Sequence, residues 1–282
     1  ERRNGPSCRA ALLQTMEDSG GFDTATAELA SDGADASSSR EAGEDFSETN
    51  KQEAGVDEAD LVKTDGRRLV TVSGNIVRVV DVEGDVPELI NSIRLPEDFY
   101  GGELFLKGDT ALLMTSGWTD IPFIGNTDIA SDWYPGSPTG RIMEIDLDAG
   151  EVNRVLEFEG GYLSAREVDG SIRIVMSAAG NRFNFVFPSN PGAEESAEKA
   201  NRDLIEESTI DMWIPTYRIT KDGDTVSEGP IVDCDRVYIP TEFAGFAALS
   251  VLTVDIDDGL SINDSLGVLS DGQTVYASTD RL

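Results

Sequence analysis

Apolar and polar residues alternate in short runs along most of the chain, and the runs end at turns of glycine and aspartate. From about residue 56 these runs are rich in valine, isoleucine, leucine and threonine, as in half-buried strands. One unit recurs: a strand, a tight turn with an aspartate, and a second strand that ends in small polar residues. Its copies are 60–73, 103–116 and 164–177, and a fourth begins at Gln273. The Asp-Gly turns predict hairpins, because both residues can take positive φ.

Two further strands are predicted after each complete copy of this unit. The third strand of each group ends in an aspartate, and these are Asp81, Asp146 and Asp255. The fourth strands are predicted at 88–95, 152–158 and 261–269. The strand-end aspartates are expected to accept hydrogen bonds from backbone N–H groups of the next turn. Four antiparallel strands per repeat, with the first two turns 44 residues apart, predict a β-propeller.

Two long insertions interrupt the repeat. Residues 118–140 are rich in proline, glycine and aromatic residues and fall within the second unit. Residues 178–240 separate the second and third strands of the third unit. Within this longer insertion, 193–207 predict a charged helix and 213–220 an extended segment.

The predicted fold class is all-β, a partial β-propeller over residues 49–282 with about three four-stranded antiparallel blades and the start of a fourth. It includes the helical insertion and a short N-terminal helix within residues 1–18. Residues 19–48 predict an acidic flexible linker, because they hold few large apolar side chains. The sequence pattern suggests that both ends of the chain are truncated. Three blades and the start of a fourth are also fewer than the about four to eight blades that close a propeller. We therefore expect a longer chain.

Composition narrows the classes of partner and of chemistry. The 282 residues include 54 acidic and 22 basic side chains and no histidine, for a formal net charge of −32. Such a surface repels phosphate backbones, so no nucleic-acid partner is expected. Without histidine, Ser-His-Asp catalysis and histidine-ligated zinc are excluded from these residues. No apolar run reaches about 18 residues, so no membrane span is predicted, and no P-loop or dinucleotide-binding motif is present.

A dense acidic cluster precedes and enters the first hairpin. Its members are Asp57, Glu58, Asp60 and Asp65. Close carboxylates repel one another unless they are paired or bridged by a cation, and oxygen ligands suit Ca²⁺. One interpretation is therefore a calcium site. The alternative is structural, in which Lys63 pairs with one of these carboxylates and Asp65 serves only its turn.

The shorter insertion carries aromatic side chains among aspartates. Trp118, Phe123, Trp133 and Tyr134 could stack on a sugar or a peptide, and loops on rigid scaffolds often carry binding sites. The alternative is that these aromatic residues only tether the loop to the blades.

The segment 47–66, SETNKQEAGVDEADLVKTDG, resembles the opening motif of a family of exported bacterial and archaeal proteins with a C-terminal β-propeller domain. That family reads S-x-T-N-x-Q-x-x-G-V-D-E-A-D-x-V-K-T-D-G. The matching positions are 47, 49, 50, 52, 55–60 and 62–66. The stretch GYLSAREVDG at 161–170 is similar to a strand that opens a later blade. The resemblance implies a secreted or cell-surface protein and a propeller that continues beyond Leu282, and it brings no settled activity.

The two cysteines, Cys8 and Cys234, lie far apart and form no CxxC pattern. They are either two buried thiols or one long-range disulfide. The resemblance to an exported family favours the disulfide, because exported proteins fold under oxidising conditions.

Three functional interpretations remain open. The preferred one is a non-catalytic exported scaffold that binds an unknown protein or carbohydrate at a loop-bearing face or at the propeller channel. The first alternative is an extracellular hydrolase that uses carboxylates, with or without calcium. The second is a structural cell-surface module. The absence of a recognisable catalytic motif favours the non-catalytic scaffold.

Overall fold

A computed structural model describes residues 55–97, 99, 101–119, 137–178, 186–207, 214–242, 244–245, 247–262, 264–279 and 281–282. The predicted N-terminal helix, the predicted linker and Cys8 lie outside these residues. Among the helices in the described ranges, none has the length and apolar character needed to cross a bilayer.

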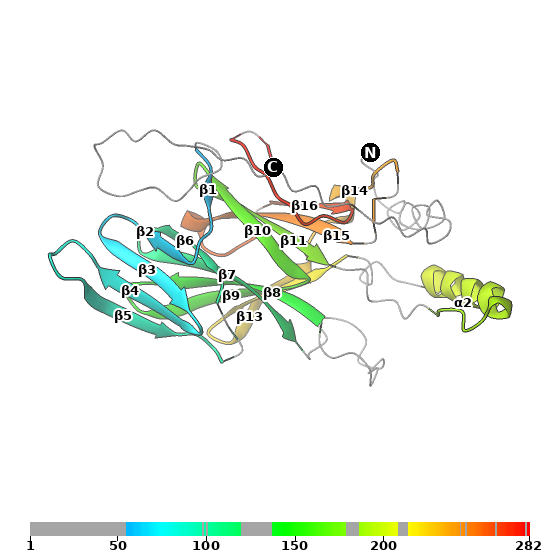
Figure 1. Ribbon diagram of the computed structural model, residues 1–282, viewed down its shortest axis with the longest axis horizontal. Helices are drawn as coiled ribbons and strands as arrows, with labels where there is room; N and C mark the ends of the chain where they lie inside the picture. The colour runs from blue at the N-terminus through cyan, green and yellow to red at the C-terminus, as the bar shows by residue number, and fades with distance from the viewer. Residues whose placement is uncertain are drawn as a thin grey trace.

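Blade one is a four-stranded antiparallel sheet (Figure 1). Its strands follow chain order from the inner to the outer edge, as the alternating pattern and the Asp-Gly turn predict. They are β2 (Val62–Thr64), β3 (Arg68–Ser73), β4 (Ile76–Asp81) and β5 (Glu88–Arg94).

Blade two begins with the predicted four strands and gains two more at its outer edge. The four are β6 (Glu103–Lys107), β7 (Thr110–Thr119), β8 (Ser137–Asp146) and β9 (Glu151–Glu159). The added strands are β12 (Thr216–Lys221) and β13 (Asp224–Pro230), and β12 pairs antiparallel with β9.

Blade three also has four predicted strands, with one short strand added at each edge. The four are β10 (Gly161–Val168), β11 (Ser171–Ala178), β15 (Ala248–Asp255) and β16 (Asp264–Leu269). The added strands are β1 (Asp57–Glu58), beside β10, and β14 (Val237–Tyr238), which runs parallel to β16. Residues 270–279, where the fourth repeat is expected to begin, contain no strand.

The long insertion links blades two and three. It contains the short helix η1 (Pro191–Ala193), the predicted helix α2 (Glu194–Glu207), which lies apart from the sheets in Figure 1, and the turn η3 (Cys234–Arg236). It also supplies β12, β13 and β14, which cover the outer strands of both blades. The sequence predicts that this insertion belongs to blade three, and its pairing with blade two is not evident from the strand pattern. Covering an outer strand satisfies backbone groups that would otherwise be open to another chain.

Blade two is buried on both faces, because alternate residues of β7 point into different cores. Ala111 and Leu113 join a cluster with blade one, whereas Leu112 and Met114 join a cluster with blade three. This explains why the apolar residues of β7 form a continuous run instead of an alternation. The middle blade therefore holds the two outer blades in place.

The strand-end aspartates act as predicted. Asp81 accepts a hydrogen bond from the backbone N–H of Glu83 at 2.9 Å. Asp146 accepts from the N–H groups of Asp148 and Ala149 in the turn that follows it, at 3.0 and 2.8 Å. Asp255 accepts from Asp257 at 3.0 Å, where the turn continues as η4 (Ile256–Asp258). This shared role in the turn explains why an aspartate recurs at the end of the third strand of each blade.

Neighbouring blades are also joined by a repeated polar contact. The amide of Asn91 on β5 donates to the carbonyl of Leu147 at 3.3 Å, in the turn after the third strand of blade two. Arg154 on β9 donates in the same way to the carbonyl of Leu260 in blade three, at 3.4 Å. On the same end of the blades, Lys107 pairs with Asp257 at 2.5 Å. This hydrogen bond raises the pKa of Lys107.

Candidate functional site

The segment 55–61 lies across the inner strands of the three blades, and we call it the inner-edge strap. In blade three, Glu58 pairs with Arg166 within the β1–β10 register (Figure 1). In blade two, the N–H of Asp60 donates to the carbonyl of Leu104 at 3.2 Å, and the N–H of Leu104 donates to the carbonyl of Asp60 at 2.7 Å. The chain then enters β2 of blade one. The strap therefore holds three inner edges together.

Both carboxylates of β1 form ion pairs. Asp57 accepts two hydrogen bonds from the ammonium of Lys63, at 2.8 and 2.9 Å. Lys63 is only 7% exposed, and its ammonium lies 5.7 Å from the centre of the Phe105 ring. Glu58 pairs with the guanidinium of Arg166 at 3.3 Å. The two acidic side chains thus contact bases from blades one and three, as expected for buried charges that must be compensated.

Asp65 lies in the first hairpin turn of blade one, where it accepts hydrogen bonds from residues of the same blade. Its carboxylate accepts from the backbone N–H groups of Arg67 and Arg68, at 3.0 and 2.6 Å, and from the Arg68 guanidinium at 2.9 Å. Burial alone would raise the pKa of Asp65, but these hydrogen bonds outweigh it and lower the pKa. Asp65 is therefore held as a carboxylate by its turn and by Arg68.

The four residues of the predicted calcium site therefore have separate contacts. The carboxylate of Asp60 accepts from the N–H of Leu61 at 2.6 Å, while the other three pair with different bases. In the described part of the chain, no three acidic or cysteine side chains form a group that could hold a metal ion. These contacts favour the structural alternative. Calcium binding stays the alternative interpretation of this cluster.

Calcium is expected to leave the thermal midpoint of the full-length protein unchanged, compared with NaCl at the same ionic strength. The reason is that Asp57 and Glu58 are already neutralised by Lys63 and Arg166. Unfolding would be followed in EDTA and then in millimolar Ca²⁺, since binding to the folded state alone raises stability. A rise that disappears in Asp57→Asn, but persists in a control Asp224→Asn, would establish a calcium site instead.

Only part of the predicted aromatic loop falls within the described residues. Trp118 lies near the end of β7, where its backbone pairs with Pro138 of β8. Phe123, Trp133 and Tyr134 lie outside the described residues. Ligand binding by this loop stays a prediction.

Tyr162 and Arg166 of the GYLSAREVDG stretch both contact other segments from β10. The hydroxyl of Tyr162 donates to the carboxylate of Glu103 on β6 at 2.9 Å. Burial, together with the charge of Glu103, raises the pKa of Tyr162, so the hydroxyl keeps its proton. Arg166 contacts the strap through Glu58. Neither contact is predictable from the sequence, because the partners of both residues are distant along the chain.

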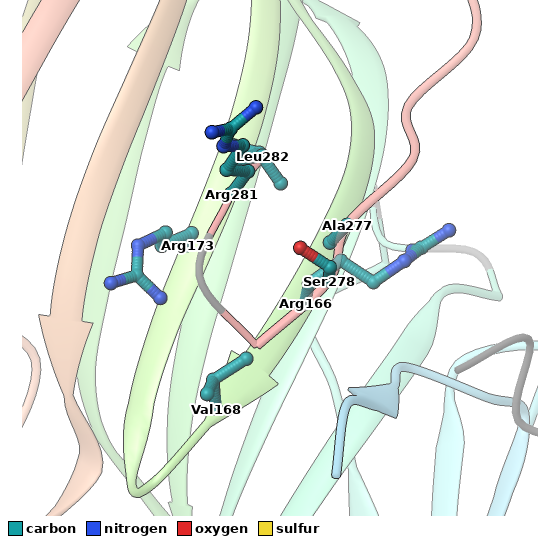
Figure 2. Close-up of a pocket in the computed structure, with 7 residues that line it drawn as sticks. All are labelled: Arg166, Val168, Arg173, Ala277, Ser278, Arg281 and Leu282. Atoms are coloured by element: carbon teal, nitrogen blue, oxygen red, sulfur yellow. The ribbon is translucent and has the colours of Figure 1, made fainter. Parts of the chain in front are cut away.

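A basic pocket lies beside the strap, between blade three and the C-terminal segment 277–282 (Figure 2). Its volume is about 50 Å³, enough for a few water molecules or one carboxylate group. Val56 of the strap packs with two of the lining residues, Val168 and Ala277. The lining comprises three arginines and four smaller or apolar residues: Arg166, Arg173, Arg281, Ser278, Val168, Ala277 and Leu282.

The three arginines differ in their partners. Arg166 is 9% exposed and is fixed by Glu58 and by the carbonyl of Ala165, to which it donates at 2.8 Å. Within the described residues, neither Arg173 nor Arg281 has an ion-pair partner. Figure 2 shows the three guanidinium groups pointing in different directions around the pocket. Among the described residues, Arg173 and Arg281 therefore add positive charge to the pocket lining without an ion-pair partner. Sequence reasoning missed this pocket, because its residues come from separate strands and a loop.

Comparisons with known proteins agree with this architecture. No curated protein and no solved structure matches the chain. A family model described as a β-propeller domain matches residues 46–282, which include all three blades and the strap. The chain therefore belongs to the β-propeller domain family.

Proposed function

We propose that the protein is an exported, non-catalytic scaffold that binds a carboxylate group of its ligand in the basic pocket. The observation that carries this proposal is the pair of arginines, Arg173 and Arg281, which have no ion-pair partner in the described residues of a protein with net charge −32. Acidic side chains outnumber basic ones in this sequence, so uncompensated arginines beside a pocket are a local excess of positive charge. Guanidinium groups bind carboxylates through charge-assisted hydrogen bonds.

The surroundings of the pocket support a binding role. Arg166 is fixed by Glu58 and the strap, so one wall of the pocket is rigid before a ligand arrives. Ser278 adds a hydroxyl that can donate to an anion. Acidic sugars and peptide C-termini both present a carboxylate, and they are the carbohydrate and protein forms of the same ligand chemistry.

Export and the Cys8–Cys234 disulfide are further parts of this proposal. Their support is the resemblance of the segment 47–66 to exported proteins. Cys234 lies in η3 and packs against the core between blades two and three. A disulfide there would join the N-terminal region to the insertion.

The binding proposal can be tested by calorimetry on the full-length protein. The probes are a glucuronate oligomer and a peptide with a free C-terminal carboxylate, each compared with its uncharged counterpart: a glucose oligomer and the amidated peptide. We expect binding of at least one acidic probe and a loss of at least about tenfold in affinity in the double variant Arg173→Gln/Arg281→Gln.

A matched control is Arg218→Gln on β12, which removes a positive charge outside the pocket, where Arg218 pairs with Glu228. This variant should bind as the native protein does. Equal affinity of the double variant and the native protein, or no binding of either acidic probe, would refute the proposal. The neutral probes report whether the carboxylate itself is recognised.

A further inference from the structure

We propose that two copies of this chain associate through the outer strand of blade one, with β5 pairing antiparallel to β5 of the second copy. This inference is independent of the basic pocket. It starts from a difference among the three blades. Segments of the insertion cover the outer strands β9 and β16, whereas β5 ends its sheet within the described residues. The protein itself therefore shows what covers such an edge: another extended segment.

The uncovered edge carries exposed aliphatic side chains. Leu89 and Ile90 of β5 are 60% and 51% exposed, and Val86, just before the strand, is 73% exposed. An edge strand with exposed aliphatic residues is a template for pairing with another strand. In the same blade, Ile93 of β5 is 4% exposed and packs toward blade two, so the strand is anchored on one face.

The order of charges along β5 selects a second copy as the partner. The strand reads ELINSIR, with Glu88 at one end and Arg94 at the other. When two such strands run antiparallel around a twofold axis near Asn91, the end of β5 that carries Glu88 lies beside the end that carries Arg94 in the second copy. Neither residue has an ion-pair partner in the described part of the chain. The twofold axis brings these opposite charges together twice, and opposite charges on facing strands are stabilising.

Two features limit the strength of this contact. The register of β4 and β5 shifts between Val79 and Val80, leaving Ile90 in a β-bulge that confines regular pairing to a short segment. The net charge of −32 on each copy also repels the other copy at low salt. Measurement at about 0.15 M salt, where the Debye length is about 8 Å, screens this long-range repulsion. We expect a weak, reversible dimer.

Sedimentation equilibrium of the full-length protein over a range of concentrations tests the proposal. The native protein should show a reversible monomer–dimer equilibrium. Glu88→Arg and Arg94→Glu each place like charges opposite one another, and each should raise the dissociation constant by at least about tenfold. The double variant, in which the two charges are exchanged, should recover the native dissociation constant, because opposite charges again face each other.

Asp224→Arg is the matched control, since it makes the same charge change as Glu88→Arg on β13, the outer strand of blade two. It should leave the dissociation constant unchanged. A native protein that stays monomeric at every concentration would overturn the proposal without any variant. A dimer that the single variants do not weaken, or that the double variant does not restore, would also overturn this pairing.

Discussion

Replacing Gly140 with alanine is expected to lower the free energy of unfolding by about 3 kcal/mol. A Cβ at this position on β8 would lie 1.9 Å from Cζ of Phe158, the residue directly opposite on β9. The ring is fully buried between blades two and three, so it cannot move aside without disturbing the core. The φ angle of Gly140 is not in the left-handed region, so the effect is one of space alone. Denaturant unfolding would measure it.

The matched control is Gly117→Ala on β7, the strand that pairs with β8. A Cβ at Gly117 has no heavy atom within 4 Å, apart from its chain neighbours. This change should therefore be neutral or slightly stabilising, because alanine has less conformational entropy to lose on folding. Phe158→Leu should recover part of the loss in the Gly140→Ala background, since the two changes act on the same space. Equal effects of the two glycine variants would contradict this account of the core.

Replacing Arg68 with methionine is expected to cost about 2 kcal/mol. Arg68 lies on β3 of blade one, and its side chain is 9% exposed. It pairs with Asp65 at 2.9 Å and with Asp109 of blade two at 2.8 Å, and it donates to the carbonyl of Gly108 at 2.7 Å. Methionine would leave the carboxylate of Asp65 and the carbonyl of Gly108 without this donor. The contribution of Arg68 to the stability of the fold should far exceed that of an exposed ion pair.

The neighbouring residue supplies the control. Arg67 pairs with Glu83 at 3.6 Å, and both side chains are more than 60% exposed. Arg67→Met should therefore change stability by less than about 0.5 kcal/mol. If both variants lose the same amount, Arg68 has no special role between the blades.

The effect of Arg68 should depend on pH in a defined direction. Because the folded protein lowers the pKa of Asp65 below its ordinary value of 3.8, the paired carboxylate stabilises the fold fully above that pH. The contribution is lost as the pH falls through the folded pKa. The stability difference between the native protein and Arg68→Met should therefore shrink below about pH 4. A difference that stays constant down to pH 2 would show that packing, not charge, accounts for the loss.

The local parts of the fold are predictable from the sequence, whereas the contacts between distant segments are not. Alternation and Asp-Gly turns locate the strands, and the aspartates at 81, 146 and 255 identify the turns that follow them. The same reasoning cannot give the partner of a charge. Glu58 pairs with Arg166, and no spacing rule relates two residues so far apart in the sequence. A cluster of carboxylates in the sequence therefore suggests a metal where the fold supplies a separate base for each of three members.

The pairing of the insertion with blade two shows the same limit. β12 lies after β11 in the chain, yet it pairs with β9 of the preceding blade. A strand pattern predicts that a segment is extended but does not identify the edge that it will join. The basic pocket cannot be recognised in the sequence for the same reason. Its residues on β10, β11 and the C-terminal segment meet only once blade three is assembled.

The late position of β12 has a consequence for synthesis of the chain. β9 ends at Glu159, and the strand that covers it begins only at Thr216. At about 5–20 residues per second, roughly 3–11 s pass between their emergence from the ribosome. During that interval the outer backbone groups of β9 are open to other nascent chains. Charged side chains lie along this strand at Arg154, Glu157 and Glu159, and charged residues on an open edge disfavour pairing with other chains.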